Sequence, residues 1–227
     1  MKKRWWIIGA VAVVILAVVA GPWIYGRFLV TDDDPAATIS TEGAQAATGT
    51  LDGEWTVTPG GGANRTAAGY TVDENLNGAA NRVVGSTDDV TGSATVESEK
   101  LTAAEVTVQV ASIATDVSIR DQVFRNGIMD TGSFPTATFV LSSPVDLSDL
   151  PTDGSVGKVT AEGMLTLRGE THPVSVDMDV LHTGDNLIAS GSIPVTWADF
   201  GVQAPSLGFV TVEHNGTVDF LVCLAHS

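Results

Sequence analysis

The sequence predicts a mainly β protein whose folded part is built from antiparallel strands. Apolar and polar residues alternate over many short segments, which is the period of a half-buried strand. Glycine is abundant (24 residues), as are threonine, valine and aspartate, a composition that suits strands joined by turns. Residues 111–139 change from the strand period to a helical one, and they predict a single short helix. Short strands joined by local turns pair antiparallel rather than parallel.

The chain is strongly acidic, with a formal net charge of −16 over 227 residues. This charge excludes nucleic acid as a partner, because too few cations are present to neutralise phosphates. It also argues against tight adsorption to anionic lipid head groups. Solubility alone accounts for such a surface charge. The length suits one domain preceded by a tail.

The N-terminal region is expected to anchor the chain in a membrane. Residues 1–4 form a basic cytoplasmic tail, and residues 5–27 are expected to form a transmembrane helix or signal anchor. No charged residue occurs from Trp5 to Ile24, and about 20 such residues span a bilayer. The basic tail stays in the cytoplasm by the positive-inside rule, so the domain lies on the extracytoplasmic side of the cell membrane. The alternative is a signal peptide cleaved after Ala20, although the apolar run is long for a signal.

Residues 28–51 are expected to form a flexible linker. Thr31–Leu51 is rich in Asp, Ala, Thr, Ser and Gly and has almost no large apolar residue with which to build a core. Residues 52–227 are therefore expected to fold on their own.

Strand alternation or strand composition recurs along the whole of this domain. The predicted strands are residues 53–57, 68–72, 82–86, 92–96, 101–110, 136–141, 159–167, 174–180, 187–193 and 218–224. Roughly eight strands closed into a barrel leave no exposed edge and enclose a space for one ligand. A packed two-sheet sandwich has the same alternation, so the pattern by itself does not choose between them.

The helical period lies between two of these strands. Large apolar residues recur there at spacings of three to four: Ile119, Val123, Phe124 and Ile128. This spacing predicts that they share one buried face of a short helix. Asp116 or Ser118 is expected to cap its N-terminus, and Gly127 is expected to end it. Such a helix can close the end of an open barrel.

Two blocks of sequence carry a resemblance to a known family. The first block reads Ser112-Ile113-x-Thr115, then Arg120-Asp121, Met129-Asp130 and Phe134-Pro135-x-Ala137-x-Phe139. The second block is Gly163-x-Leu165-Thr166-x-x-Gly169-x-Thr171. Together they resemble the signature of the YceI family of lipocalin-like, polyisoprenoid-binding proteins, over roughly residues 52–222.

The resemblance implies a lipocalin-like barrel of a bacterial cell envelope, with the short helix beside the barrel mouth. Arg120-Asp121 is expected to anchor that helix by hydrogen bonds rather than to contact a ligand. The chain departs from the family at one point: the first long strand usually begins with a His-Ser pair, whereas residues 67–70 read Ala-Ala-Gly-Tyr. The head group of the ligand is therefore left open.

The predicted ligand is a long apolar lipid such as a polyisoprenoid or a quinone, because a lining of Val, Leu, Met, Phe and Tyr fits a methyl-branched hydrocarbon. Each CH₂ moved from water to such a wall contributes about 0.8 kcal/mol. The candidate wall residues are Trp55, Tyr70, Val72, Val106, Val108, Phe124, Ile128, Met129, Phe134, Phe139, Leu165, Leu167, Val176, Met178, Phe200 and Phe209. For any one of them the simpler interpretation is that it fills the core. Small inward residues such as Gly163 and Gly191 favour a hollow interior. The alternative function is a structural or stress-related envelope protein with a filled barrel and a protein partner. The oligomeric state is left open, with a dimer among the alternatives.

The sequence has no pattern typical of an enzyme. It contains no Gly-x-Ser-x-Gly elbow and no phosphate-binding loop. His172, His182, His214 and His226 have no metal-ligand spacing, and we interpret each as a surface or loop histidine. The single cysteine, Cys223, allows no disulfide within the chain and is expected to be a half-buried, inert thiol, with an intermolecular bridge as the alternative. We therefore expect no catalysis, no metal and no cofactor.

Overall fold

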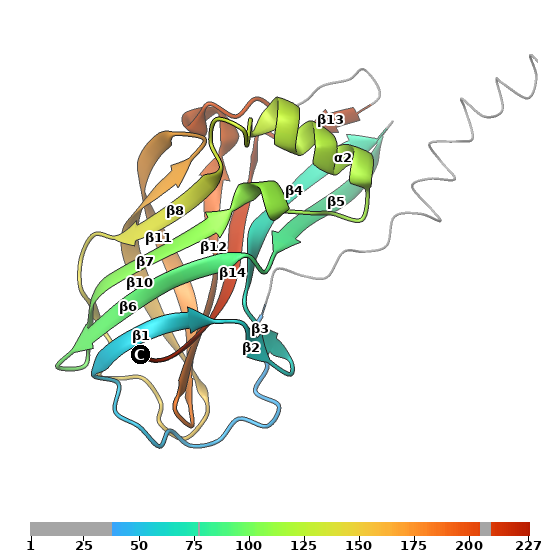
Figure 1. Ribbon diagram of the computed structural model, residues 1–227. Coiled ribbons are helices and arrows are strands. Elements are labelled where there is room, and N and C mark those ends of the chain that lie inside the picture. The colour runs from blue at the N-terminus through green and yellow to red at the C-terminus, as the bar shows by residue number, and fades with distance from the viewer. Residues whose placement is uncertain (1–37, 77, 205–209) are drawn as a thin grey trace, which may run out of the picture.

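The computed structural model of the chain describes residues 38–76, 78–204 and 210–227 (Figure 1). The expected cytoplasmic tail, the expected transmembrane segment and the first part of the expected linker lie outside these residues. Within the described part, none of the helices has the length and apolar character needed to cross a bilayer.

Antiparallel strands form a closed barrel around one core. In barrel order they are β1 (Gly53–Thr58), β6 (Val90–Glu97), β7 (Lys100–Gln109), β8 (Thr136–Leu141), β10 (Val156–Leu167), β11 (Glu170–Thr183), β12 (Asn186–Thr196) and β14 (Asn215–His226). Each strand pairs with the next, and β14 pairs back onto β1. The predicted mainly β barrel of about eight antiparallel strands is thereby confirmed.

A hairpin extends the sheet beyond one end of the barrel. It consists of β4 (Ala67–Leu76) and β5 (Ala79–Thr87), and β4 pairs with the first half of β14 while β1 pairs with the second half. The remaining strands are short: β2 (Gly60–Gly61), β3 (Asn64–Arg65), β9 (Val145–Asp146) and β13 (Val210–Val212). Figure 1 shows the hairpin beside the helix, at the end of the barrel that we call the mouth.

The strand register separates an inner from an outer face. Ala161 lies opposite Val176, and Val176 packs in the main core together with Val222. The neighbours of these residues along each strand point outward, since successive side chains of a strand alternate between the two faces of the sheet. The main core therefore lies inside the barrel.

The helical segment differs in phase from the prediction. A helix α2 (Ser118–Val123) continues as a π-helical turn η2 (Phe124–Ile128), and Ile119 and Val123 are 64% and 48% exposed. Asp121 and Phe124 are the buried residues of these two segments. The π turn widens the helix, with the N–H of Met129 donating to the carbonyl of Phe124 at 2.8 Å, so the spacing of three to four no longer describes one face.

The predicted ends of the helix are also wrong. Its N-cap is Val117, which makes no side-chain capping bond, and neither Asp116 nor Ser118 takes that place. Gly127 lies inside η2 rather than after it. Two short 3₁₀ segments complete the helical structure of the described residues, η1 (Val110–Ser112) and η3 (Trp197–Phe200).

Residues 38–51, which were expected to belong to a flexible linker, lie against the outside of the barrel. The Ala47 N–H donates to the carbonyl of Thr152 at 2.9 Å, and a parallel bridge joins Ala47 to Gly184. Ile39 and Ala44 pack on a second apolar cluster on the outer face, formed by Leu181, Ile188, Leu221 and Cys223. This cluster requires a cover, because outward apolar side chains on neighbouring strands would otherwise form an exposed patch.

Candidate functional site

The inner wall of the barrel carries apolar side chains that protein atoms only partly cover. Half-buried inward residues above the level of Trp55 include Val106, Val108, Phe139, Leu141, Val159, Val174, Met178, Ala189, Val218 and Phe220. Neighbouring strands cover the edges of an inward side chain but not its tip. The tip is covered only if other side chains fill the lumen in front of it. The described residues therefore leave apolar surface uncovered at these levels of the barrel.

The opposite end of the barrel is filled, and we call its layer the floor. The floor residues are Trp55, Val96, His182, Leu187 and Leu224, all buried. Trp55 is fully buried, and its indole N–H donates to the carbonyl of Leu51 at 2.9 Å. The ring of His226 lies against Trp55 with 3.9 Å between centroids. The barrel is thus closed at one end and lined with partly uncovered apolar side chains above it.

His182 is not the surface histidine that the sequence predicted. It lies on the inner face of β11 opposite Leu187, is 2% exposed, and packs edge-on against Trp55 at 6.3 Å between centroids. Neither of its ring nitrogens has a hydrogen-bond partner in the structure. Burial lowers the pKa of His182, because removal from water disfavours the charged imidazolium.

An aromatic pair closes part of the mouth. Phe124 of η2 is 8% exposed and stacks on Tyr70 of β4, with 5.1 Å between ring centroids. Burial raises the pKa of Tyr70 to about 12, while nearby Arg120 lowers it and the carboxylates of Asp121 and Glu74 raise it. The phenol is therefore a neutral, largely apolar element of the mouth.

Hydrogen bonds and ion pairs fix the helix over the hairpin, as expected for Arg120 and Asp121. The carboxylate of Asp121 accepts from the N–H and hydroxyl of Thr115 at 2.9 and 2.7 Å. Arg120 pairs with Asp116 at 2.6 Å and with Glu74 of β4 at 3.6 Å. Because two carboxylates match its charge, this arginine serves to hold the helix and is not free for an anionic ligand.

The inward glycines make room for rings rather than for an empty space, contrary to the prediction. A methyl group at Gly163 would overlap the ring of Phe139. At Gly191 a methyl group would come within 3.0 Å of both Phe220 and Val176. The uncovered surface of the wall therefore depends on the half-buried side chains, not on the glycines.

The predicted site residues divide into three groups. The half-buried residues are Tyr70, Val106, Val108, Ile128, Phe134, Phe139 and Met178, of which Phe134 lies against Gly169 and Arg168 and is not part of the main core. Buried residues are Trp55, Val72, Phe124, Met129, Leu165, Leu167, Val176 and Phe200. Phe209 lies outside the described residues. A ligand contact of any of these residues stays a prediction.

Sequence reasoning missed six wall residues that the structure brings to the same surface: Leu141, Val159, Val174, Ala189, Val218 and Phe220. The strand alternation contained the signal for them. Val174 shares the inward face with Val176, and Phe220 shares it with Val222, so a complete list of one face would have included them.

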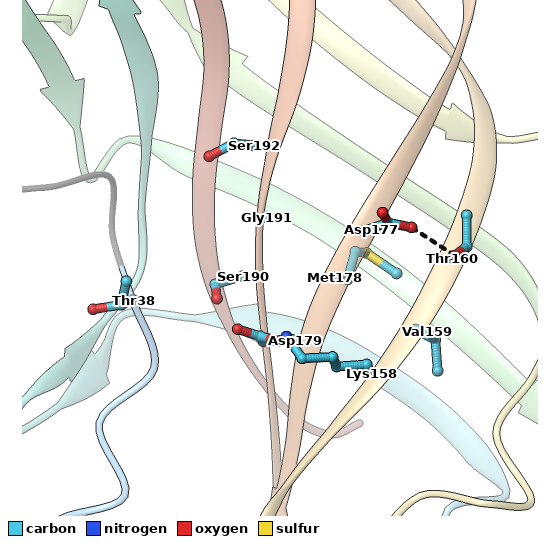
Figure 2. A pocket seen from close by; sticks show the side chains of 10 residues that line it. All are labelled: Thr38, Lys158, Val159, Thr160, Asp177, Met178, Asp179, Ser190, Gly191 and Ser192. Atoms are coloured by element: carbon cyan, nitrogen blue, oxygen red, sulfur yellow. Dashed lines mark hydrogen bonds and ion pairs between the residues drawn. The ribbon is translucent and has the colours of Figure 1, made fainter.

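A separate groove of about 540 Å³ crosses the outside of the barrel over β10, β11 and β12 (Figure 2). Lys158 pairs there with Asp179 at 2.6 Å, and the Thr160 hydroxyl donates to Asp177 at 2.7 Å. The groove is lined by these paired polar side chains together with Val159, Met178 and Gly191. Throughout the part of the chain that is described, no group of three or more His, Cys, Asp or Glu side chains is arranged to hold a metal ion.

Comparisons with known proteins agree with this architecture. A structure described as a polyisoprenoid binding domain from Saccharophagus degradans, implicated in plant cell wall breakdown, aligns with a TM-score of 0.59 at 15% identity, covering 76% of this chain and 98% of the other. BcnA of Burkholderia cenocepacia aligns with a TM-score of 0.52 at 21% identity, covering 68% and 95%. At these identities the similarity shows a shared fold. A search of curated proteins found no match. The model of a YceI-like domain matches residues 55–223, which is most of the chain, and the protein therefore belongs to the YceI family.

Proposed function

We propose that this protein binds a long apolar lipid, of the polyisoprenoid or quinone class, inside its barrel, and that it does so outside the cytoplasm while tethered to the cell membrane. The observation that carries the binding proposal is the half-buried apolar wall above a closed floor. Val106, Phe139 and Met178 present uncovered hydrocarbon to the lumen, and a flexible apolar chain would remove that surface from water. Each buried CH₂ would contribute about 0.8 kcal/mol.

The comparisons support the ligand class at a coarser level. The chain belongs to the YceI family, and one protein of the same fold is described as a polyisoprenoid binding domain. Membership supports a binding role rather than catalysis. The specific lipid is the proposal, and it is drawn from the apolar wall.

The tether is supported by sequence alone. The uncharged run from Trp5 to Ile24 is long enough to cross a bilayer at about 1.5 Å per residue, and basic residues precede it. Residues 25–37 then separate this run from the described domain. A tether of this kind would keep a lipid carrier beside the membrane from which its ligand comes.

The binding proposal is tested by native mass spectrometry of residues 38–227 purified without delipidation. A discrete added mass, identified as an isoprenoid or quinone after extraction, is expected. Val106→Phe places a larger ring in the lumen and should lower lipid retention by at least tenfold, which corresponds to about 1.4 kcal/mol. The matched control is Val140→Phe, at a position on β8 that is 42% exposed and outside the barrel.

The outcome separates this function from that of a structural protein with a filled barrel. A filled barrel carries no lipid, and Val106→Phe would then overpack the core and cost about 1–3 kcal/mol of stability. Absence of any bound lipid together with such a loss would overturn the proposal.

The location is tested independently. Protease added to intact protoplasts should digest the domain while a cytoplasmic marker survives. Recovery of the whole domain in the soluble culture fraction would show cleavage after Ala20. If the domain resists protease in intact protoplasts and is digested only after they are lysed, it lies in the cytoplasm.

A further inference from the structure

The floor contains a titratable group that the proposed function does not use. His182 is 2% exposed and has no hydrogen-bond partner for either ring nitrogen. A buried polar group without a partner destabilises the folded state, because it has lost its hydrogen bonds to water. An aliphatic residue would fill the same layer without that cost.

His182 lies below the lumen rather than in its wall. Along β11 the inward residues are Met178, Val180 and then His182, and Val180 is itself buried. Along β11 the half-buried surface ends at Met178, and the half-buried Ala189 of β12 lies beside Val180, so a lipid in the lumen meets this layer before the imidazole. In this order the imidazole belongs to the floor and does not contact a ligand in the lumen.

The surroundings favour the neutral imidazole. Trp55 packs against one side, and removal from water lowers the pKa of His182. The positive charge of a protonated His226 on β14 lowers it further, whereas Asp185 in the β11–β12 turn raises it. Asp185 already accepts a hydrogen bond from the Thr48 hydroxyl, and no carboxylate among the described residues forms an ion pair with His182.

We propose that His182 makes the floor of the barrel a proton-operated closure: the layer around Trp55 stays shut while the imidazole is neutral, and uptake of one proton opens that end of the barrel. An imidazolium cannot remain in an apolar layer without a partner, so it reaches water by displacing the groups above and below it. The groups that must move are Trp55, which the Leu51 carbonyl holds, and His226, whose ring contacts the Thr50 carbonyl. The use of this opening to release lipid in acid rests on the proposed function.

The proposal fixes the slope of the pH dependence. If opening takes up a single proton, the equilibrium constant for opening rises tenfold for each unit of falling pH, below the pKa of the exposed imidazole at about 6.5. A merely unstable strand end would open to the same extent at every pH once intrinsic exchange rates are corrected.

Hydrogen exchange of the ligand-free full chain in a mild non-ionic detergent tests this between about pH 8 and pH 5. Peptides that cover residues 51–58 and 178–188 should lose protection tenfold per pH unit in the acidic range, whereas peptides from β8 should not. His182→Phe should abolish the slope in the floor peptides. His214→Gln, at an exposed histidine, is the matched control and should leave the slope intact.

The proposal would be overturned if the hydrogen-exchange protection of the floor peptides did not change with pH in the unmodified chain. It would also be overturned if the pH dependence of that protection persisted in His182→Phe. If that variant does not fold, the nuclear magnetic resonance titration of His182 decides: an imidazole that titrates near its ordinary value while the floor stays protected refutes the closure. A second experiment measures how much of a fluorescent isoprenoid alcohol, loaded beforehand, the chain retains at neutral and at acid pH. Acid opening without any lipid retained at neutral pH would leave the closure standing and would contradict the proposed function instead.

Discussion

Gly163 shows how one residue sets the shape of the inner wall. Its position on β10 lies against the ring of Phe139, and an added methyl group would overlap that ring. We expect Gly163→Ala to lower the free energy of unfolding by about 1–3 kcal/mol, as overpacking of a filled site does. Urea denaturation at neutral pH measures the change.

The control for this substitution is Gly127→Ala. A methyl group at Gly127 would meet no atom within 4 Å, and this glycine lies in η2 without a positive φ. Alanine should therefore leave stability unchanged or raise it by about 0.4–1 kcal/mol. Equal stability of both variants and the unmodified chain would mean that the Phe139 ring swings into the lumen, which is then roomier than the packing indicates.

Tyr70 offers a test of the mouth by titration. The chain has two tyrosines, Tyr25 and Tyr70, so residues 38–227 contain Tyr70 alone. Its pKa of about 12 exceeds the ordinary value of 10.0, so the unfolded state loses the proton first. Stability from this group is complete below about pH 10 and is lost as the pH rises from 10 to 12.

The absorbance of the phenolate measures that shift directly. Its midpoint should lie near pH 12 in the unmodified domain and should move towards 10 in Phe124→Ala, which uncovers the ring by removing its stacking partner. A midpoint near 10 in the unmodified domain would contradict the closed mouth.

At the scale of the element, the helix behaves as part of the core on one side only. Phe124 is buried against Tyr70, whereas Ile119 is 64% exposed. We expect Phe124→Ala to cost up to about 3–5 kcal/mol, the range for a truncated core phenylalanine. Ile119→Ser should change stability by less than about 0.5 kcal/mol, because it alters an exposed site.

Thermal unfolding of the ligand-free domain compares the two variants. A cost of Ile119→Ser comparable to that of Phe124→Ala would restore the face that the sequence predicted. If Phe124→Ala costs little yet lowers lipid retention about tenfold, its ring borders the ligand space rather than the core.

The alternation of apolar and polar residues was sufficient to locate the barrel strands, because every barrel strand has one face inside the barrel and one face outside it. β10 and β11 illustrate this, since their inward residues follow every second position without interruption. The helix was harder, because a six-residue helix followed by a π turn has too few positions to fix its phase. Its orientation comes instead from the Asp121 bonds to Thr115, which join residues across a loop.

His182 could not be placed in the floor from local pattern. It continues the inward alternation of Val176, Met178 and Val180, and that periodicity indicates an inward side chain. Composition argued the other way, because histidines are more often exposed than fully buried. Only the pairing of β1 with β14, which brings Trp55 over it, shows that the position is sealed.

At the scale of the whole molecule, the segment outside the barrel is part of the fold. Ile39 and Ala44 cover the cluster that contains Cys223, and Ser40 exchanges two hydrogen bonds with Asn64, each of 2.8 Å. The sequence predicted a linker here because the segment has few apolar residues. The requirement for a cover comes from the barrel, whose outward residues Leu181, Ile188 and Leu221 are apolar.

Two truncations separate the segment from the rest of the tail. Removal of residues 1–37 should leave thermal unfolding unchanged, whereas removal of residues 1–51 should lower the midpoint by several degrees. The second truncation uncovers apolar surface worth about 2 kcal/mol, at roughly 2–4 °C per kcal/mol for a domain of this size. It also removes the Leu51 carbonyl that holds Trp55.

Cys223 reports the same change without unfolding the protein, because it is the single cysteine of the chain. Its thiol is buried, and burial raises its pKa, so alkylation should be slow in the full chain and in the shorter truncation. Alkylation should become at least tenfold faster once residues 38–51 are removed. An unchanged midpoint together with an unchanged alkylation rate would show that residues 52–227 fold alone and that the outer cluster needs no cover.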